Sequence, residues 1–402
     1  MRRGSATTDT SAIAPSLDRV RGVRTVPTDG SPAAATALGD AALAALEGRG
    51  PAVLPIGPGD PAPGPDLLAP VDDDVAAVVT TTGSTGAPKA VLLPAAALIA
   101  SADATYARLG PPGRWLLALP AHHIAGLQVL LRSARAGSPA VVMDLRSGFR
   151  PDAFAALAPG VAYTSLVPTQ LVRLLDAGGA ALDALRGVTA VLLGGAAADA
   201  SLLARAAAEG VPVVTTYGMS ETCGGCVYDG RPLDGVTVTL EDDGRIRLGG
   251  ATVAAGYRGA VSAADTAAFL PDGFRTNDLG AWSADGRLEV LGRADDVIVT
   301  GGEKVAPATV ERALLALSGV REACVVGVPD PEWGARVVAA VVGDGLDAEA
   351  LRAAVAPGLG RAAPRAVTVL DALPLRGIGK PDRAAVRALL ADGPTASDRA
   401  TS

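Results

Sequence analysis

Short apolar runs alternate with helical patterns through the middle of the chain, between residues 75 and 216. Each run is bounded by polar or turn-forming residues, as is typical of strands buried in a parallel sheet. The stretches between them have apolar residues at helical spacing, and Asp199 stands where it would cap one helix. The pattern predicts a mainly parallel, layered α/β sheet. The expected strands cover residues 75–80, 115–119, 140–143, 161–165, 188–193 and 211–216, and helices cover 168–177 and 199–208.

The pattern changes after residue 217. Two alternating runs, 236–240 and 245–248, flank an acidic turn that ends in Gly244 and predict a β-hairpin. Further short strands follow, and the charged segment 292–296 separates this β-rich part from a last α+β unit. In that unit we expect helices over 306–317, 347–355 and 382–390 and strands over 323–328, 337–342 and 367–370. The predicted fold class is therefore a multidomain α/β protein, with a large layered domain, a β-rich subdomain and a small α+β domain.

The composition agrees with a folded protein and excludes some partners. Of the 402 residues, 49% are hydrophobic and 19% are charged, and the formal net charge is −7. Nucleic acids and anionic membranes attract basic proteins, so we expect neither as a partner. No apolar run is long enough to span a membrane, and none follows the charged first residues as in a signal peptide, so we expect a cytoplasmic protein.

Three segments lack any periodicity. Residues 1–20 and 390–402 are rich in Ser, Thr, Ala, Asp and Pro, and we expect them to be disordered tails. Residues 51–70 are rich in Pro and Gly, and we expect them to form a loop that leads into the first strand.

The cysteines and histidines do not form a recognisable metal or disulfide pattern. Cys223 and Cys226 have C-x-x-C spacing, but they lie between a turn-rich segment and a strand, unlike a thioredoxin motif. A zinc site would need a second pair of ligands, and His122 and His123 are distant in sequence. We expect both cysteines to be small packing residues.

The segment 80–89, Thr-Thr-Thr-Gly-Ser-Thr-Gly-Ala-Pro-Lys, lies between two apolar runs. Glycine permits the positive φ angles with which backbone N–H groups can surround a phosphate, and the hydroxyls and the lysine add donors and charge. The segment lacks the Walker A pattern, which opens a helix. Taken alone, it is equally compatible with an ordinary turn between two strands.

A second polar cluster, residues 215–222, stands where a strand ends, which is the edge at which open α/β sheets bind ligands. Within it Tyr217 is suited to stacking on a base, Glu221 to holding Mg²⁺ and Thr222 to donating to a phosphate. Such an octapeptide standing alone is more often a loop.

Three later segments also carry polar residues near glycines. In 274–280, Asp278 could accept both hydroxyls of a ribose. Segment 292–305 begins with Gly-Arg-Ala-Asp-Asp, and segment 373–383 places Lys380 between a glycine and a proline.

In this order the five segments resemble those of the adenylate-forming superfamily of acyl-CoA synthetases, luciferases and nonribosomal-peptide adenylation domains. The resemblance covers residues 75–383. It implies an N-terminal domain over 21–292 that binds ATP and a carboxylic acid, a hinge over 293–296 and a mobile C-terminal domain over 297–389. Asp295 would be the hinge residue, because a short solvated side chain can change φ and ψ without unpacking a core.

Within the superfamily the sequence is most similar to the o-succinylbenzoate–CoA ligases of menaquinone biosynthesis. Residues 119–127, LPAHHIAGL, resemble their L-P-x-x-H-x-x-G-L stretch, and residues 164–171 and 217–227 resemble T-S-x-V-P-T-Q-L and a segment that begins Y-G-M-T-E-T-C. Only about 75 residues precede the phosphate loop. Longer relatives have a larger N-terminal subdomain, so the resemblance does not define part of the wall of the acid pocket.

The resemblance implies two half-reactions that use ATP, Mg²⁺ and coenzyme A. Lys380, Glu221 and Thr222 would be catalytic: Lys380 would bridge the carboxylate and the α-phosphate, and Glu221 would hold the metal. The residues expected around the nucleotide are Thr81, Thr82, Gly83, Ser84, Thr85, Gly86, Lys89, Gly195, Ala196, Thr216, Tyr217, Gly218, Asp278 and Arg293.

The acid is expected to meet a separate group of residues. His123 suits an acid without an amino group, since amino-acid-activating relatives place an aspartate in this region. Arg132 is the candidate to bind a second, non-reacting carboxylate. In the bare sequence, a core histidine and a solvated or salt-bridged arginine are the more usual interpretations. The other expected contacts are Gly194, Gly218, Met219 and Ser220.

The sequence leaves alternatives open for the function. One is another acyl- or aryl-CoA ligase, or an acyl-AMP ligase that loads a carrier protein. The other is a non-catalytic nucleotide-binding relative. Whether the protein is a monomer or a homo-oligomer does not follow from the sequence.

Overall fold

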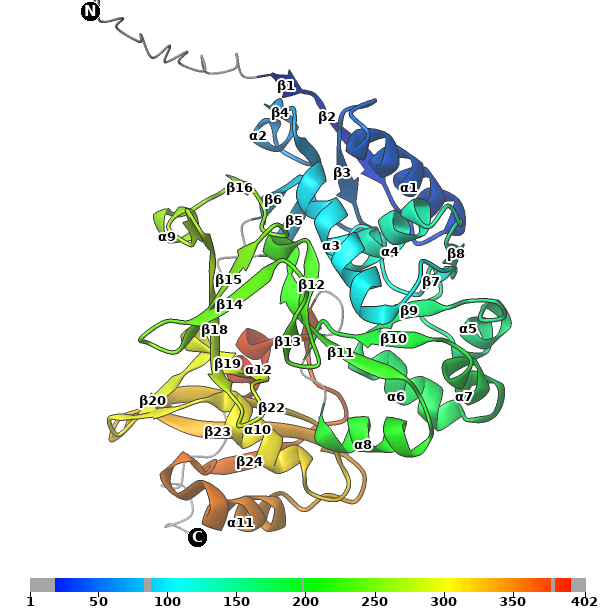
Figure 1. Cartoon of the computed structure of the whole chain (residues 1–402). Helices are drawn as coiled ribbons and strands as arrows, with labels where there is room; N and C mark the ends of the chain where they lie inside the picture. Colours follow the sequence, from blue (N-terminus) through cyan, green and yellow to red (C-terminus); the bar gives the residue numbers. More distant parts are fainter. Residues whose placement is uncertain (1–18, 83–87, 197–198, 377–379, 392–402) are drawn as a thin grey trace, which may run out of the picture.

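The computed structural model describes residues 19–82, 88–196, 199–376 and 380–391, without the side chains of Thr82, Pro88, Arg376 and Lys380. Most of the two expected tails therefore lies outside the described residues. Along the chain, three sheets with their helices are followed by a C-terminal sheet unit (Figure 1). In the described part no helix is both long and apolar enough to cross a membrane.

The first sheet is mixed and has the strand order β16-β6-β5-β3-β2. Strands β2, β3 and β5 run parallel, whereas β6 and β16 are antiparallel to their neighbours. The strands are β2 (Val23–Pro27), β3 (Ala52–Ile56), β5 (Val75–Thr82), β6 (Pro88–Pro94) and β16 (Gly256–Gly259). Beside this sheet, β1 (Val20–Arg21) pairs with β4 (Val71–Asp72).

The expectation of a loop over residues 51–70 is wrong for its first part. Residues 52–56 form β3, which lies inside the first sheet, and its Ala52, Val53 and Leu54 are fully buried. The run is short and contains Pro55, and a proline within a run normally argues against a central strand. Burial of the apolar run outweighs that local signal here.

The second sheet contains the predicted parallel strands. Its order is β13-β12-β11-β10-β9-β7-β8, and the strands from β8 to β11 are all parallel, which confirms the layered α/β prediction. At its other edge β12 and β13 are antiparallel. The strands are β7 (Trp115–Leu117), β8 (Val141–Val142), β9 (Tyr163–Leu166), β10 (Ala190–Leu193), β11 (Val213–Met219), β12 (Gly224–Tyr228) and β13 (Arg231–Pro232).

Helices cover both faces of the second sheet (Figure 1). Because side chains alternate along a strand, Trp115 and Leu117 of β7 join the core shared with the first sheet, whereas Leu116 faces a second core. The shared core also holds apolar residues of α1 (Pro32–Leu46), α3 (Ala95–Leu109) and α4 (Ile124–Arg135). The second core is closed by α5 (Pro151–Leu157), α6 (Pro168–Ala177), α7 (Gly179–Arg186) and α8 (Ala200–Ala208). The short α2 (Pro65–Leu68) lies at the first sheet.

The predicted hairpin forms the start of a third, antiparallel sheet. Strands β14 and β15 pair across the turn that ends in Gly244, and the sheet order is β14-β15-β18-β17 with β19 beside β18. The elements are β14 (Val236–Leu240), β15 (Arg245–Gly250), α9 (Ala263–Thr266), β17 (Phe269–Leu270), β18 (Gly273–Trp282) and β19 (Leu288–Arg293).

The C-terminal unit has two cores on the two faces of one sheet. Val325 faces α10 and α11, and its neighbours Cys324 and Val326 face α12. All the elements expected here are present. They are α10 (Pro307–Leu315), β22 (Val320–Asp330), β23 (Gly334–Gly343), α11 (Ala348–Leu359), β24 (Ala366–Val369) and α12 (Arg383–Ala391). Two small hairpins are added, β20 (Ile298–Thr300) with β21 (Glu303–Val305), and β25 (Leu375–Arg376) with β26 (Lys380–Pro381).

Helix α4 approaches the segment before it very closely at Gly126. A Cβ atom at this position would overlap the carbonyl oxygen of Pro120 and lie 2.9 Å from the Cα of Ala121. Backbone atoms cannot move aside as a flexible side chain can. The glycine of the L-P-x-x-H-x-x-G-L stretch therefore sets how α4 meets the edge of the sheet.

Gly126→Ala is expected to lower the free energy of unfolding by about 1–3 kcal/mol, because the added methyl overpacks this contact. Chemical denaturation measures the change. Gly358→Ala is the matched control: this glycine is also helical, is exposed and has open space at its Cβ position. It should be neutral or slightly stabilising, since alanine favours helices. Equal effects of the two substitutions would contradict the role of Gly126.

Candidate active site

The carboxyl edge of the parallel strands brings several expected residues together. A side chain at Gly194, just after β10, would overlap the Thr216 hydroxyl, so only glycine fits there. That hydroxyl donates to the carbonyl of Leu193 at 3.2 Å, which fixes the neighbouring strand end. Gly195, with φ of 82°, and Ala196 follow as an exposed turn. The edge thus offers an open backbone surface beside β11.

A tyrosine, an aspartate and an arginine from three strands meet near this edge. The Tyr217 hydroxyl of β11 donates to Oδ2 of Asp278 at 2.8 Å. Asp278 of β18 is paired in register with Arg293 of β19, whose Nη1 lies 3.7 Å from Oδ1 of Asp278. Burial, and then the charge of Asp278, raise the pKa of Tyr217, so the phenol stays protonated and is the donor. The structure brings together three residues that the sequence analysis assigned to the nucleoside.

Glu221 and Thr222 lie in a tight turn, η1 (Ser220–Thr222), that joins β11 to β12. The Thr222 hydroxyl is fully buried; it accepts from the N–H of Met219 at 3.0 Å and bonds to the carbonyl of Gly224 at 2.8 Å. In this arrangement Thr222 shapes the turn that carries Glu221, and its expected contact with a phosphate stays a prediction. Position 218 also requires a glycine for a structural reason, because a Cβ there would overlap the carbonyl oxygen of Gly224.

The expected phosphate segment connects β5 and β6, which are antiparallel strands of the first sheet. Thr81 is paired with Lys89 and Thr82 with Pro88. Gly83, Ser84, Thr85 and Gly86 lie outside the described residues. The structure therefore gives the two ends of the segment, with Lys89 at the start of β6.

Two residues that the sequence analysis passed over contact this lysine. Lys89 Nζ lies 2.6 Å from Oδ1 of Asp265 in α9 and 4.1 Å from the centroid of the Tyr257 ring. The hydrogen bond from Lys89 holds the pKa of Asp265 at about 2. The signal available in the sequence was a tyrosine inside Gly-Tyr-Arg-Gly at residues 256–259, one of five tyrosines in the chain.

The two histidines differ in their surroundings. His123 is the N-cap residue of α4, and its ring centroid lies 4.2 Å from that of His122. Nδ1 of His122 lies 3.2 Å from the Thr28 hydroxyl, which already donates to the carbonyl of Ile56. A Cβ on Gly57 would overlap the His122 ring, so that ring packs closely against the backbone of Gly57. His123, in contrast, lies at the start of α4.

Arg132 lies well away from His123. It is 3% exposed, with its guanidinium carbon 5.2 Å from the ring centroid of Trp115, the first residue of β7. Nine residues of helix separate it from His123, which corresponds to about 14 Å. It thus packs near the amino end of a strand whose carboxyl end faces the candidate site. We do not include Arg132 among the proposed substrate contacts.

The expected hinge and the expected catalytic lysine belong to the C-terminal part. Asp295 lies in η2 (Ala294–Asp296) and forms a bidentate ion pair with Arg293, at 2.8 and 2.6 Å. The backbone of Lys380 lies in β26, paired with Arg376, while its side chain is outside the described part. Arg293 thus connects the expected hinge segment to Asp278, which the sequence analysis assigned to the nucleoside.

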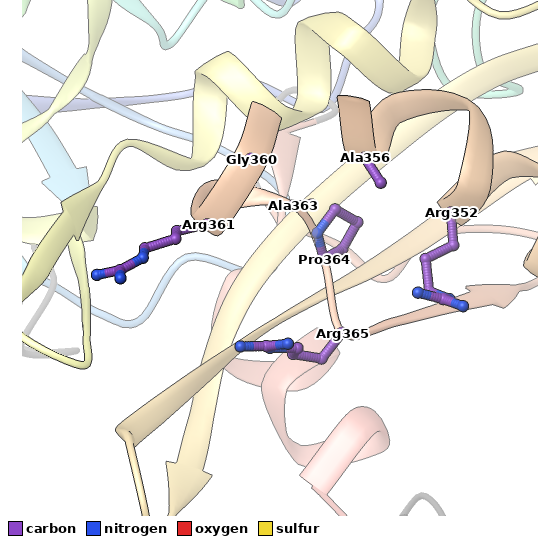
Figure 2. Close-up of a pocket in the computed structure, with 7 residues that line it drawn as sticks. All are labelled: Arg352, Ala356, Gly360, Arg361, Ala363, Pro364 and Arg365. Carbon is purple, nitrogen blue, oxygen red and sulfur yellow. The ribbon is translucent and has the colours of Figure 1, made fainter. Parts of the chain in front are cut away.

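A separate group of cations surrounds a hollow of about 260 Å³ in the C-terminal unit (Figure 2). Arg352 comes from α11, Arg361 from η3 (Gly360–Ala362) and Arg365 from the segment before β24. The guanidinium of Arg365 also lies 5.3 Å from the centroid of the Trp333 ring. The other lining residues are Ala356, Gly360, Ala363 and Pro364. No residue expected to bind ATP or the acid lines this hollow, so it is a second cationic surface.

The donor set fits a magnesium ion that is shared with phosphates. Mg²⁺ commonly takes one or two carboxylates and completes its shell with water and substrate oxygens, and Glu221 offers one carboxylate that is 8% exposed. No group of three His, Cys, Asp or Glu residues that could by itself hold a metal occurs in residues 19–82, 88–196, 199–376 and 380–391. Cys223 and Cys226 are free and fully buried, and burial raises the pKa of the Cys226 thiol to about 12. These buried, protonated thiols agree with the expected packing role.

Family models match most of the chain. The model described as AMP-binding enzyme matches residues 6–273, and the AMP-binding enzyme C-terminal domain matches residues 309–380. The chain is also 54% identical over 327 residues to a protein of Mycobacterium tuberculosis named probable 2-succinylbenzoate–CoA ligase. That alignment covers 79% of this chain and 85% of the relative.

Solved structures of a similarly named enzyme also resemble this chain. The o-succinylbenzoate CoA synthetase of Bacillus subtilis, in complex with its acyl-adenylate intermediate, is 30% identical with a TM-score of 0.70, over 85% of this chain and 75% of that chain. The same enzyme in complex with ATP and a magnesium ion is 29% identical with a TM-score of 0.69, over 86% and 81% of the two chains.

The stability of the protein is expected to fall below about pH 6.5 because of His122. Burial lowers the pKa of His122 from 6.5, so the native state binds fewer protons than the unfolded chain between the two values. The stabilisation that comes from a neutral His122 is fully present above the pKa of the unfolded state. It is lost as the pH falls through the lower pKa of the folded state. The free energy of unfolding, measured by chemical denaturation at about pH 7.5 and about pH 5.5, should therefore change less with pH for His122→Asn than for the wild type. An equal difference in both proteins would contradict this assignment.

Proposed function

The chain belongs to the AMP-binding enzyme family, and from this membership we propose that it is an ATP-dependent 2-succinylbenzoate–CoA ligase of menaquinone biosynthesis. The observation that carries the proposal is the 54% identity to a relative of that name, over 85% of the relative's length. The protein would act in the cytoplasm, where ATP and coenzyme A are available.

The reaction has two half-reactions. In the first, a carboxylate oxygen of the acid bonds to the α-phosphorus of ATP, and the bond to the β-phosphate oxygen breaks to release pyrophosphate. In the second, the thiol of coenzyme A bonds to the acyl carbon and gives up its proton, and AMP leaves. The first step brings an anion to a polyanion, so its barrier is largely electrostatic.

Positive charge near the phosphates is therefore the main requirement for the first step. At about 4 Å and an effective dielectric constant of ~20, each unlike pair contributes roughly 4 kcal/mol before desolvation. We assign Lys89 to the departing pyrophosphate and Lys380 to the α-phosphate and the acid. Glu221 would hold Mg²⁺, which when bound neutralises phosphate charge.

The nucleoside would be held by the cluster at the carboxyl edge. Asp278 has carboxylate oxygens for the ribose hydroxyls, and Arg293 beside it balances the charge. Tyr217 and the turn at Gly195 would enclose the base. The acid would then extend along Gly194 and Met219 toward His123, whose imidazole stands where amino-acid-activating relatives place an aspartate and so suits an acid that has no ammonium group.

Coenzyme A requires a second anion site, because its nucleotide carries a 3′-phosphate as well as a diphosphate. The hollow around Arg352, Arg361 and Arg365 supplies guanidinium groups, which bind phosphate well. One of the three, Arg352, is already paired with Glu349 at 3.0 Å. We therefore assign the 3′-phosphate chiefly to Arg361 and Arg365.

The purified protein is expected to release pyrophosphate from ATP when o-succinylbenzoate and Mg²⁺ are present, and to form a thioester when coenzyme A is added. Benzoate and medium-chain acids should be poor substrates. Lys380→Ala should slow pyrophosphate release by ~10²–10³-fold, as for loss of one preorganised donor, and should spare thioester formation from supplied acyl-AMP.

The other functions predict different results in that assay. A preference for another acid would indicate a different acyl-CoA ligase, and transfer only to a carrier protein would indicate a loading enzyme. If no acid caused pyrophosphate release, the protein would be a nucleotide-binding relative without catalysis. Equal loss of both half-reactions in Lys380→Ala would exclude the assigned role of that lysine.

Arg361→Ala and Arg365→Ala are each expected to raise the KM for coenzyme A about tenfold, as for loss of a charge-assisted hydrogen bond, without changing pyrophosphate release. Dephospho-coenzyme A, which lacks the 3′-phosphate, should be used equally by the wild type and the variants. Arg387→Ala changes an exposed arginine of α12 away from the hollow and is the control. An unchanged KM in both hollow variants would contradict the assignment.

A further inference from the structure

Tyr257 connects the first and second sheets at the candidate site. Tyr257 belongs to β16, the edge strand of the first sheet, and is paired there with Val91 of β6. Its hydroxyl donates to Oε1 of Glu221 at 2.5 Å, and Glu221 lies in the turn after β11 of the second sheet. One side chain therefore spans from the strand that carries Lys89 to the turn that carries Glu221.

The same ring also contacts Lys89. The ammonium nitrogen lies 4.1 Å from the ring centroid, within the range of a cation–π interaction. Asp265 holds Lys89 in place with an ion pair of 2.6 Å, and its other oxygen accepts from the Ser262 hydroxyl at 2.7 Å. Lys89 is thus fixed between a carboxylate and an aromatic face.

Packing keeps the Tyr257 ring in one orientation. Phe269 and Phe274 lie against it, with ring centroids 5.0 and 6.3 Å away and nearly perpendicular planes. The position of the ring also determines where the hydroxyl points.

A backbone hydrogen bond supports the same connection. The N–H of Ala254 donates to the carbonyl of Glu221 at 2.9 Å, and the N–H of Ala255 donates to the carbonyl of Leu92 at the same distance. The segment that leads into β16 is therefore tied to the turn of Glu221 and to β6. The hydroxyl of Tyr257 adds the side-chain contact that orients the Glu221 carboxylate.

We propose that Tyr257 is a positioning residue that holds Glu221 and Lys89 at a fixed separation, so that one Mg²⁺-bound triphosphate meets both. The inference rests on the proposed function only for the identity of the nucleotide. The hydrogen bond engages Oε1 of Glu221 and leaves Oε2 as the metal ligand. A triphosphate requires this alignment, whereas AMP, which lacks the β- and γ-phosphates, does not.

Calorimetric titration with β,γ-methylene-ATP in Mg²⁺, and separately with AMP, tests the inference without turnover. Tyr257→Phe keeps the ring and removes only the hydroxyl. It should weaken binding of the Mg²⁺-bound analogue about tenfold, as for loss of one hydrogen bond to a charged group. The affinity for AMP should not change. With EDTA in place of Mg²⁺, the wild type and the variant should bind the analogue equally.

Tyr228→Phe is the matched control. It removes a hydroxyl from a fully buried tyrosine whose partner is Thr105, at 3.0 Å, so it should alter stability without altering either affinity. Glu221→Gln should weaken binding of the Mg²⁺-bound analogue, and adding Tyr257→Phe should cause no further loss, because the hydroxyl acts through Glu221.

Three results would overturn the proposal: an unchanged affinity of Tyr257→Phe for the Mg²⁺-bound analogue, parallel losses for the analogue and AMP, or additive losses in the double variant. None of these measurements depends on the acid. A failure to form a coenzyme A thioester would therefore refute the proposed function and leave the inference about Tyr257 to be decided by the titrations.

Discussion

Strands β7, β9 and β10 bury side chains on both faces, and most of the N-terminal architecture follows from that burial. Leu116 packs on one side and Trp115 and Leu117 on the other, so each face needs a helical layer or a second sheet. Helices α3 and α4 carry several of the polar side chains that are buried between the sheets, among them Gln128 and Arg132. Open α/β sheets bind ligands where their strands end, and the candidate site lies at that edge, at Gly194 and Tyr217.

Most elements after residue 75 were predictable from sequence because their signals are local. The apolar runs, the Asp199 cap, which accepts from the N–H of Ser201, and the acidic hairpin turn each lie within a few residues. Strand β3 was missed because Pro55 contradicts its short apolar pattern. The meeting of Tyr217 with Asp278 was expected only through the family resemblance, since no local rule brings together residues so far apart.

Contacts between distant segments were the part that sequence did not reveal. Lys89 and Asp265 are separated by 176 positions, and Tyr257 and Glu221 by 36. The antiparallel pairing of β16 with β6 brings the first pair together, and the hydrogen bond from Ala254 to Glu221 accompanies the second. Arg132 shows a related limit: its residue type suits a carboxylate, whereas its place along α4 puts it against Trp115 in the core, and its expected contact with a second carboxylate stays a prediction. Residue type alone does not tell which end of a helix reaches the ligand.

The ion pairs of Arg293 have a consequence for the thermodynamics of the domains. This arginine contacts Asp278 in the nucleoside cluster and Asp295 in the proposed hinge. A torsion at Asp295 would change the ion pairs of Arg293, and with them the electrostatic environment of the proposed ribose pocket at Asp278. Linkage is reciprocal, so occupancy of that pocket would bias the rotation of the C-terminal domain by the same free energy with which the rotation alters nucleotide affinity. One side chain would then let the bound state of the nucleotide set the order of the two half-reactions.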